Sequence, residues 1–278
     1  MTKITASDVN KLRQMTGAGM MDCKKALVES EGDFDKAIEN LRKKGQKLAS
    51  KRADRDANEG YVLAKTSPCH KFAAIIMMNC ETDFVAKNQE FIDFANNVTE
   101  QALKEKIADK EQITSLSING RTVSEHITDL IGKIGEKIEI SHYHLIEAPY
   151  CAAYNHHGNK IASAVAFNKS DADNIQEVGK NIAMQIAAMN PVAVDKDDVP
   201  QEVVEREIEI GKEQAREEGK PEHIIQKIAE GKLEKFYKDN TLLNQDYIKE
   251  AKQSVKAYLA QAHKDLTVTA FKRLELGA

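Results

Sequence analysis

The sequence has no long apolar run, few prolines and few cysteines. No stretch approaches the roughly 20 consecutive apolar residues needed to cross a bilayer. The four cysteines include no Cys-x-x-Cys pair, which favours free thiols over a disulfide framework. Only five of the 278 residues are proline and no low-complexity tract occurs, so a largely disordered chain is not expected. These absences argue against a membrane-spanning protein and against a secreted disulfide scaffold.

The chain also lacks a strong excess of charge of either sign. Its formal net charge is −4, which provides no global attraction to nucleic acid or to an acidic membrane. Residues 1–8 contain no apolar stretch of the kind found in signal peptides, and Asp8 fits a transit peptide poorly. We therefore expect a cytoplasmic protein that binds neither nucleic acid nor membranes directly, while self-association stays open. The length and a hydrophobic content of 41% allow two or three domains.

Residues 5–45 show the pattern of three short helices. Thr5 or Ser7 can cap the first helix, Thr16-Gly17-Ala18-Gly19 ends it, and Gly45 is the expected end of the third. A unit of about 40 residues can bury little surface, so we expect it to be small and marginally stable alone. The basic run 43–52 is either a phosphate-binding patch or a solvated helical linker. We favour the linker, because no aromatic residues alternate with the charges.

The middle of the chain contains one pattern twice. Residues 71–79 align with residues 160–168, an offset of 89 (160 − 71), and both stretches read as buried strands. At the same offset, Tyr61-Val62-Leu63-Ala64 resembles Tyr150-Cys151-Ala152-Ala153, and each copy continues into an apolar helix. Further helices are expected at 123–134 and 245–262. We therefore predict two similar α+β units.

One feature occurs in only one of the two copies. Thr82-Asp83-Phe84-Val85 lies where the first buried strand gives way to a helix, whereas the second copy has Lys169-Ser170-Asp171-Ala172 aligned with residues 80–83. Connections usually lie at the surface. Phe84 is therefore either folded back under its own helix or offered to another molecule. Because the scaffold is repeated and this feature is not, a purely structural role for Phe84 is less expected.

Residues 200–238 interrupt the second copy with dense charge. Pro200 and Pro221 can each begin a helix, since a proline in the first turn loses no intrahelical hydrogen bond. Each helix carries only a narrow apolar stripe, which predicts an antiparallel helical hairpin rather than a core element. The alternative is a charged linker without fixed structure. A closing strand is expected at 266–276.

No convincing catalytic pattern is present. The sequence has no phosphate-binding Gly-x-x-x-x-Gly-Lys loop, no Gly-x-Ser-x-Gly elbow and no His-Glu-x-x-His. His142, His144 and Cys151 allow a metal site to be imagined, but closed zinc sites draw on more tightly paired ligands. Cys80 with a distant histidine is a combination that any chain with free cysteines offers. We expect no catalytic residue, no metal site and no cofactor, so the apolar residues at structural breaks, Phe84 with Met20 and Met21, are the main candidates.

Two longer motifs carry a resemblance to a known family. The stretch from Leu12-Arg13-x-x-Thr16 through Gly17-Ala18-Gly19-Met20-Met21-Asp22-Cys23 to Leu27 resembles the N-terminal signature of bacterial elongation factor Ts. The stretch Asn79-x-Glu81-Thr82-Asp83-Phe84-Val85-Ala86 resembles that family's second signature. The duplicated core, the hairpin and the closing strand follow in the family's order over the whole chain.

The resemblance implies an α+β fold with an N-terminal module similar to ubiquitin-associated three-helix domains. Under this interpretation, residues 1–55 form the module and residues 56–145 form the first core subdomain. Residues 146–278 form the second core subdomain, which is interrupted by the hairpin at 200–240 and closed by the strand at 266–276.

The resemblance also implies a function without covalent catalysis. Members of the family are guanine-nucleotide exchange factors for elongation factor Tu, in its GDP-bound and nucleotide-free forms. Thr82, Asp83, Phe84 and Val85 would form the element that dislodges Mg²⁺ and disturbs phosphate coordination. Leu12, Met20 and Met21 would touch the nucleotide-binding domain. A histidine before a glycine would contact another domain; it matches His157-Gly158, with His156 as its neighbour. A binding adaptor is the second hypothesis, and a hydrolase using metal or cysteine the third.

Overall fold

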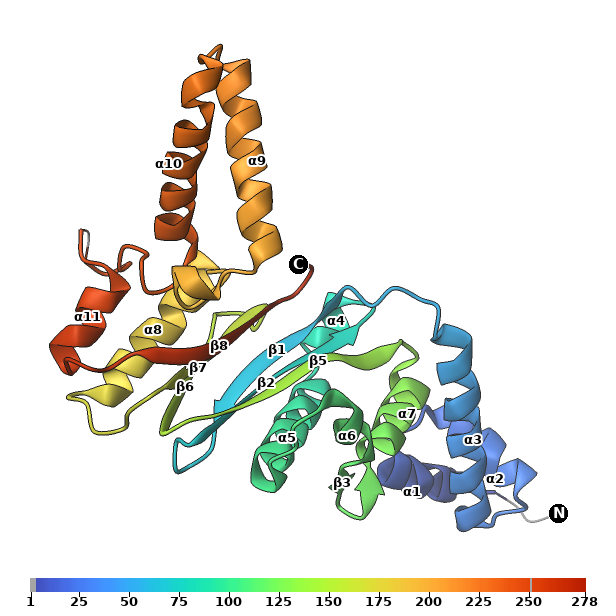
Figure 1. Ribbon diagram of the computed structural model, residues 1–278. Helices are drawn as coiled ribbons and strands as arrows, with labels where there is room; N and C mark the ends of the chain where they lie inside the picture. Colours follow the sequence, from blue (N-terminus) through green and yellow to red (C-terminus); the bar gives the residue numbers. More distant parts are fainter. Residues whose placement is uncertain (1–3, 251) are drawn as a thin grey trace. The chain divides into compact units, whose positions relative to one another are not determined.

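The computed structural model describes residues 4–250 and 252–278, which form a mixed arrangement of helices and small sheets (Figure 1). The elements in chain order are α1 (Ala6–Thr16), α2 (Met20–Glu29), α3 (Phe34–Arg52), β1 (Glu59–Thr66), β2 (Phe72–Cys80), α4 (Asp83–Ala86), α5 (Gln89–Glu105), α6 (Lys110–Ser115), β3 (Ser117–Ile118), β4 (Arg121–Thr122), α7 (Val123–Ile134), β5 (Ile138–Glu147), β6 (Tyr150–Asn155), β7 (Ile161–Phe167), α8 (Ile175–Met189), the 3₁₀ turn η1 (Lys196–Asp198), α9 (Gln201–Glu217), α10 (Glu222–Asn240), α11 (Val255–Ala262) and β8 (Val268–Glu275). Two compact units emerge. One contains the chain up to Leu63, Ile76–His144 and Glu275–Ala278, and the other contains Ala64–Ile75 and Leu145–Leu274.

The first two helices lie where their sequence signals predict, and so does the start of the third. Thr5 caps α1 in a capping box with Asp8, whose N–H donates to the Thr5 hydroxyl at 3.2 Å while the Thr5 N–H donates to the Asp8 carboxylate at 2.9 Å. Gly17 ends α1 with a left-handed backbone (φ 67°), which glycine adopts without a steric penalty. The helices enclose a small apolar core whose fully buried members are Leu12, Cys23, Leu27 and Ala37.

Gly45 does not end the third helix, so this prediction was wrong. Helix α3 continues through Gly45 to Arg52 and includes the basic run that begins at residue 43. The glycine instead permits a close crossing with α7: a Cβ added to Gly132 would lie 3.1 Å from the Cα of Gly45. A helical glycine costs about 1 kcal/mol relative to alanine. The gain here is backbone contact between two helices.

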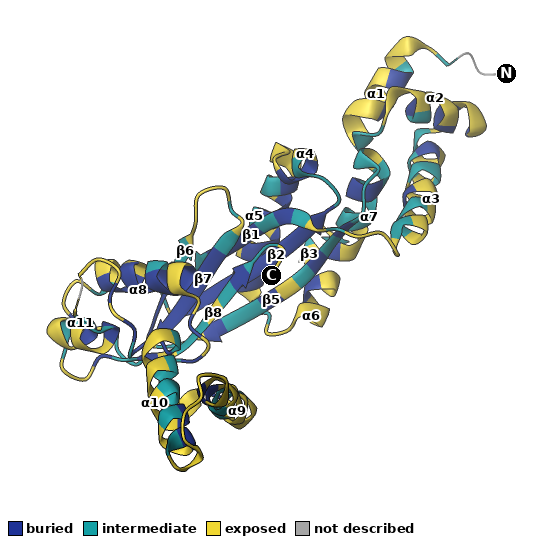
Figure 2. Ribbon diagram, turned by 90° about the horizontal axis from the view of Figure 1, so that it is seen from above, coloured by how far each residue is buried: buried dark blue, intermediate teal, exposed yellow. Residues whose placement is uncertain are grey.

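The sheet of the first copy has the order β1-β2-β5, which places β2 in the middle. All nine residues of β2 are buried, as expected for a strand covered on both faces (Figure 2). Gly60 in β1 lies against this strand, where an added Cβ would come within 2.3 Å of the Met78 carbonyl oxygen. Strand β5 continues to Glu147, two residues past the expected subdomain boundary at 145.

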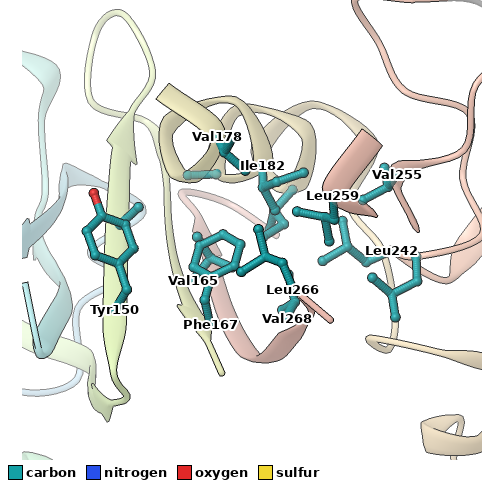
Figure 3. Packing of buried hydrophobic residues seen from close by; sticks show 14 of the residues in the cluster. Tyr150, Val165, Phe167, Val178, Ile182, Leu242, Val255, Leu259, Leu266 and Val268 are labelled. Carbon is teal, nitrogen blue, oxygen red and sulfur yellow. The ribbon is translucent and has the colours of Figure 1, made fainter. Parts of the chain in front are cut away.

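The second copy repeats this order as β6-β7-β8. Strand β7 begins at Ile161 and β2 at Phe72, an offset of 89 (161 − 72). Strands β6 and β7 pair antiparallel, with Tyr150 opposite Phe167, and the rings of these two residues are 6.1 Å apart. Figure 3 shows part of this core, in which Ile182 of α8 and Leu259 of α11 lie in one apolar cluster with Val268 of β8.

The helix expected over 245–262 is present only from Val255 to Ala262, so the first half of this prediction was wrong. Residues 241–250 follow an irregular path fixed by a buried glutamine pair. The Gln185 side chain donates to the Gln245 carbonyl oxygen at 3.1 Å and accepts the Ile248 N–H at 2.9 Å. These bonds satisfy buried polar groups that a helix would otherwise pair.

Helices α9 and α10 lie side by side as an antiparallel hairpin (Figure 1). Their contact is narrow, with Ala215, Ile225 and Ala229 buried. At Gly211 an added Cβ would lie 3.1 Å from the Cα of Ala229, which shows how closely the two backbones approach. Among the described residues, no helix combines the length and apolar character needed to span a membrane.

Candidate functional site

A four-residue helix, α4, follows β2 and carries the Asp-Phe pair. Thr82 is extended (φ −126°, ψ 155°) and acts as the N-cap, its hydroxyl accepting the Val85 N–H at 3.5 Å. The N–H groups of Ala86 and Lys87 donate to the carbonyls of Thr82 and Asp83 at 3.2 and 3.1 Å. Two residues later Asn88 caps α5, so α4 is a single turn between a buried strand and a long helix.

Phe84 points away from the body of the protein. Its side chain is 83% exposed, whereas its neighbours Val85 and Ala86 are buried. Figure 2 shows the corresponding contrast between the exposed part of α4 and the buried strands beneath it. The ring is therefore not folded back under its helix. Burying it would gain about 1.5–3 kcal/mol, which the isolated chain forgoes.

The carboxylate of Asp83 is already paired within α4. Its Oδ2 lies 2.6 Å from the Lys87 ammonium, one helical turn away, and the hydrogen bond and charge of Asp83 raise the pKa of Lys87. The Lys87 side chain is largely accessible to water and that of Asp83 is partly accessible. The outward face of this turn therefore presents an aromatic ring beside an ion pair.

The residue before the cap, Glu81, is held by three donors that the sequence interpretation did not identify. Its carboxylate accepts from Arg52 Nη1 at 2.7 Å, Arg55 Nη1 at 3.0 Å and the Lys137 backbone N–H at 2.6 Å. Burial acts to raise the pKa of Glu81, but the hydrogen bonds from Lys137, Arg52 and Arg55 together outweigh it and lower the pKa to about 2. The charged carboxylate thus connects the end of α3 and the start of β5 to the base of α4.

A second glutamate, Glu136, holds the cap residue itself. The backbone N–H and the hydroxyl of Thr82 donate to its two carboxylate oxygens at 3.0 and 2.7 Å. Glu136 follows Gly135, which ends α7 with a left-handed backbone (φ 84°). The glycine signals the helix end in the sequence, but no local pattern relates position 136 to position 82, more than fifty residues away.

The methionines expected to touch a partner lie at the start of α2. Met20 and Met21 are exposed, at 54% and 73%, and so are Met15 and Val28. Leu12 differs, because it is fully buried in the core of the three helices. It lies beneath the surface that the methionines present and does not belong to it.

His157 lies in the tight turn between β6 and β7, in the second compact unit. The turn closes through a hydrogen bond from the Asn159 N–H to the His156 carbonyl at 2.9 Å, with Gly158 in a left-handed conformation. His156 Nδ1 lies 3.1 Å from the Tyr154 hydroxyl. Both histidines are exposed, and the imidazole of His156 contacts the Tyr154 hydroxyl.

The buried thiols are poorly suited to nucleophilic chemistry. Burial, together with the charge of Glu136, raises the pKa of Cys80 to about 12, and its thiol donates to the Thr82 carbonyl at 3.2 Å. Burial likewise raises the pKa of Cys151 to about 11. Across residues 4–250 and 252–278, no three His, Cys, Asp or Glu side chains are grouped so that they could hold a metal ion.

Comparisons with known proteins agree on one family. A family model described as elongation factor TS matches residues 81–278. The chain is 54% identical to elongation factor Ts of Christiangramia forsetii over 277 residues, covering 100% of both chains. It is 50% identical to elongation factor Ts of Flavobacterium psychrophilum, again over 100% of both, and 49% identical to that of Porphyromonas gingivalis over 99% of both.

Proposed function

Because this chain belongs to the elongation factor Ts family, we propose that it is a guanine-nucleotide exchange factor for elongation factor Tu in translation elongation. It binds the GDP-bound GTPase, promotes release of GDP and leaves when GTP binds. The observation that carries this proposal is the exposed Phe84 ring on a helix whose other apolar residues, Val85 and Ala86, are buried.

The proposed action requires no bond to be made or broken by this chain. A GTPase holds its nucleotide through backbone donors and a lysine around the phosphates, with Mg²⁺ bridging them. Release requires several of these contacts to weaken together. A protein that binds the nucleotide-free conformation more tightly than the nucleotide-bound one shifts the equilibrium toward release.

Phe84 supplies the difference in affinity. If the ring is buried only in the displaced arrangement of the partner, its burial contributes about 1.5–3 kcal/mol. That energy favours the displaced arrangement roughly 10- to 100-fold. By reciprocity, bound nucleotide weakens the binding of this chain by the same factor, so incoming GTP can expel it.

The residues around Phe84 have supporting roles in the proposal. Thr82 starts the helical turn, Val85 anchors it, and Asp83 pairs with Lys87 on the exposed side. This pairing favours a role for Asp83 in hydrogen bonding to the partner's loops over direct capture of Mg²⁺. The turn as a whole would disturb the partner's Mg²⁺ and phosphate contacts.

Two further surfaces would provide affinity. Met20 and Met21 offer adaptable apolar side chains to the nucleotide-binding domain, with Leu12 supporting them from the core beneath. His157 would contact another domain of the partner, a role that its exposure permits and that the Tyr154 contact of His156 makes less suitable for that neighbour. We place this activity in the cytoplasm.

The release of a fluorescent GDP analogue from purified elongation factor Tu tests the proposal. With unlabelled GDP in excess, the chain is expected to accelerate the loss of fluorescence, and the rate should saturate as its concentration rises. A reaction without the chain gives the intrinsic rate. Unchanged release, despite a complex seen by size-exclusion chromatography, would leave only the binding adaptor.

A further inference from the structure

The structure assigns Glu136 as a positioning residue for Phe84, an inference that rests on the proposed function. Glu136 lies in the connection between α7 and β5, and its carboxylate accepts hydrogen bonds from the backbone N–H and the hydroxyl of Thr82. Thr82 is the residue from which α4 begins. The glutamate thus controls the ring through the cap, without being part of α4.

The bonds at Thr82 fix the direction of its hydroxyl. The single hydroxyl proton is donated to Glu136 Oε1 at 2.7 Å, so an oxygen lone pair remains for the Val85 N–H. The Thr82 carbonyl accepts from the Ala86 N–H at 3.2 Å and from the Cys80 thiol at 3.2 Å. Every polar atom of Thr82 therefore has a partner, and two of these bonds end on Glu136.

We call the two hydrogen bonds from Thr82 to the Glu136 carboxylate the Glu136 clamp. A further hydrogen bond between the neighbouring residues, Lys137 and Glu81, runs in the opposite direction. Thr82 donates its N–H to the Glu136 carboxylate, while Lys137 donates its N–H to the Glu81 carboxylate at 2.6 Å. Each of the two segments, 81–82 and 136–137, thus donates one backbone N–H to the glutamate carboxylate of the other. Hydrogen bonds to a carboxylate are roughly twice as strong as neutral ones.

This arrangement matters because α4 is too short to hold itself in place. An isolated turn fixes several dihedral angles for very few hydrogen bonds, so it is unstable without tertiary contacts. Val85 and Ala86 anchor its inner side, but Phe84 has no comparable support because it is exposed. The Glu136 clamp holds the turn formed before a partner arrives, which lowers the ordering cost of burying the ring in the displaced arrangement.

The test combines an ordering measurement with exchange kinetics. In Glu136→Ala, hydrogen–deuterium exchange of a peptide covering residues 81–88 is expected to become about tenfold faster in the isolated chain. The maximal rate of GDP release should fall about tenfold, with the half-saturating concentration changed less than about twofold. Glu136→Gln keeps one acceptor oxygen and should fall between the wild type and Ala.

A double-mutant cycle shows whether Glu136 acts through the ring. In a Phe84→Ala background, adding Glu136→Ala should reduce the release rate no further. Thr82→Val removes the hydroxyl, and with it both the bond to Glu136 and the cap on the Val85 N–H, so it should also speed deuterium exchange in residues 81–88. Glu136→Gln, which keeps the size of the side chain, provides the second route to the result if Glu136→Ala fails to fold.

A matched control lies in the same compact unit. Glu125 makes an equivalent clamp on Thr122, the N-cap of α7, accepting its N–H at 2.8 Å and donating its own N–H to the Thr122 hydroxyl at 3.2 Å. Glu125→Ala should loosen the start of α7 and leave deuterium exchange in residues 81–88 unchanged.

The outcomes separate this inference from the proposed function. If the wild-type chain does not accelerate GDP release, the exchange function fails and the deuterium measurement alone decides on the clamp. Unchanged deuterium exchange in folded Glu136→Ala would overturn the inference. So would an equal loss of release rate with and without Phe84.

Discussion

The two copies of the core have similar frameworks, but their strand–helix junctions differ: one buries its apolar residue and the other exposes it. In the second copy the connection after β7 is tied to the segment before β8: the Asn168 side chain donates to the Asp265 carbonyl at 2.8 Å and accepts the Thr267 N–H at 2.9 Å. Ala172 in that connection is buried in the core. In the first copy the connection after β2 forms α4 and exposes Phe84.

The difference lies in the residues rather than in the order of elements. The offset of 89 places Ala172 at the position of Asp83 and Asp173 at that of Phe84 (172 − 83 and 173 − 84). The junction after β7 is held by hydrogen bonds to the segment before β8, whereas the junction after β2 exposes the Phe84 ring to solvent. A repeated framework therefore supplies stability at both places, and a four-residue change makes one of them available to a partner.

The largest expected effect comes from removing the ring that only the first junction has. Phe84→Ala should lower the rate of GDP release roughly 10- to 100-fold, because the burial energy of the ring is lost in the displaced state. The exposed ring makes few contacts in the free chain, so the free energy of unfolding should change by less than about 0.5 kcal/mol. Ile210→Ala, which shortens an exposed apolar residue on α9, is the control. A folded Phe84→Ala protein with wild-type kinetics would contradict the account.

The reverse change at the second junction should affect stability instead. Ala172→Phe forces a large ring into a packed core and should lower the free energy of unfolding by about 1–3 kcal/mol, measured by urea denaturation. Where the protein remains folded, the rate of GDP release should stay near that of the wild type. Tolerance of the ring without loss of stability would mean that this junction is as open as the first.

The acid sensitivity of the first junction depends on Glu81. Its folded-state pKa of about 2 lies below the ordinary value of 4.5, so its contribution to the free energy of unfolding is fully present above pH 4.5 and is lost as the pH falls toward 2. After allowance for screening by solvent, this contribution is up to about 2 kcal/mol. The thermal unfolding temperatures of the wild type and Glu81→Gln should therefore approach each other as the pH is lowered from 4.5 toward 2. Parallel pH profiles would show that the carboxylate is not held as described.

The smallest effect is expected from the hairpin, which interrupts only the second copy. Deleting residues 201–238 and bridging the gap should leave the second core folded, because the buried residues of α9 and α10 contact mainly each other across Gly211 and Ala229. Cooperative thermal unfolding within a few degrees of the wild type is expected. A product without a cooperative transition would show that the hairpin is part of the core.

Much of the fold could be predicted from local patterns. Thr5 marks the start of the first helix through its side chain and Gly17 marks its end through its backbone preference, and the structure confirms both. The apolar run over residues 72–78 indicated a buried strand. Two predictions failed where tertiary contacts override such signals. Gly45 lies at a helix crossing instead of a helix end, and residues 245–250 follow the Gln185 hydrogen bonds instead of forming a helix.

The candidate site was predictable only in part. The absence of Phe84 from the second copy indicated an exposed role, and the structure places the ring in solvent. The carboxylates that hold its helix are far less visible, because Glu136 meets Thr82 only after the chain has passed through α5, α6 and α7. Leu12 lies within a motif that mixes core and surface residues, and the motif alone does not separate them.

The most direct test of the central claim observes position 84 itself in the complex. A trifluoromethyl-phenylalanine placed at that position gives one ¹⁹F resonance, which should report a solvent-exposed ring in the free chain. On addition of nucleotide-free elongation factor Tu, we expect a shifted and broadened signal that is protected from a soluble paramagnetic reagent, and its reversal when GDP is added. An unchanged, unprotected resonance in a complex confirmed by size-exclusion chromatography would contradict the account.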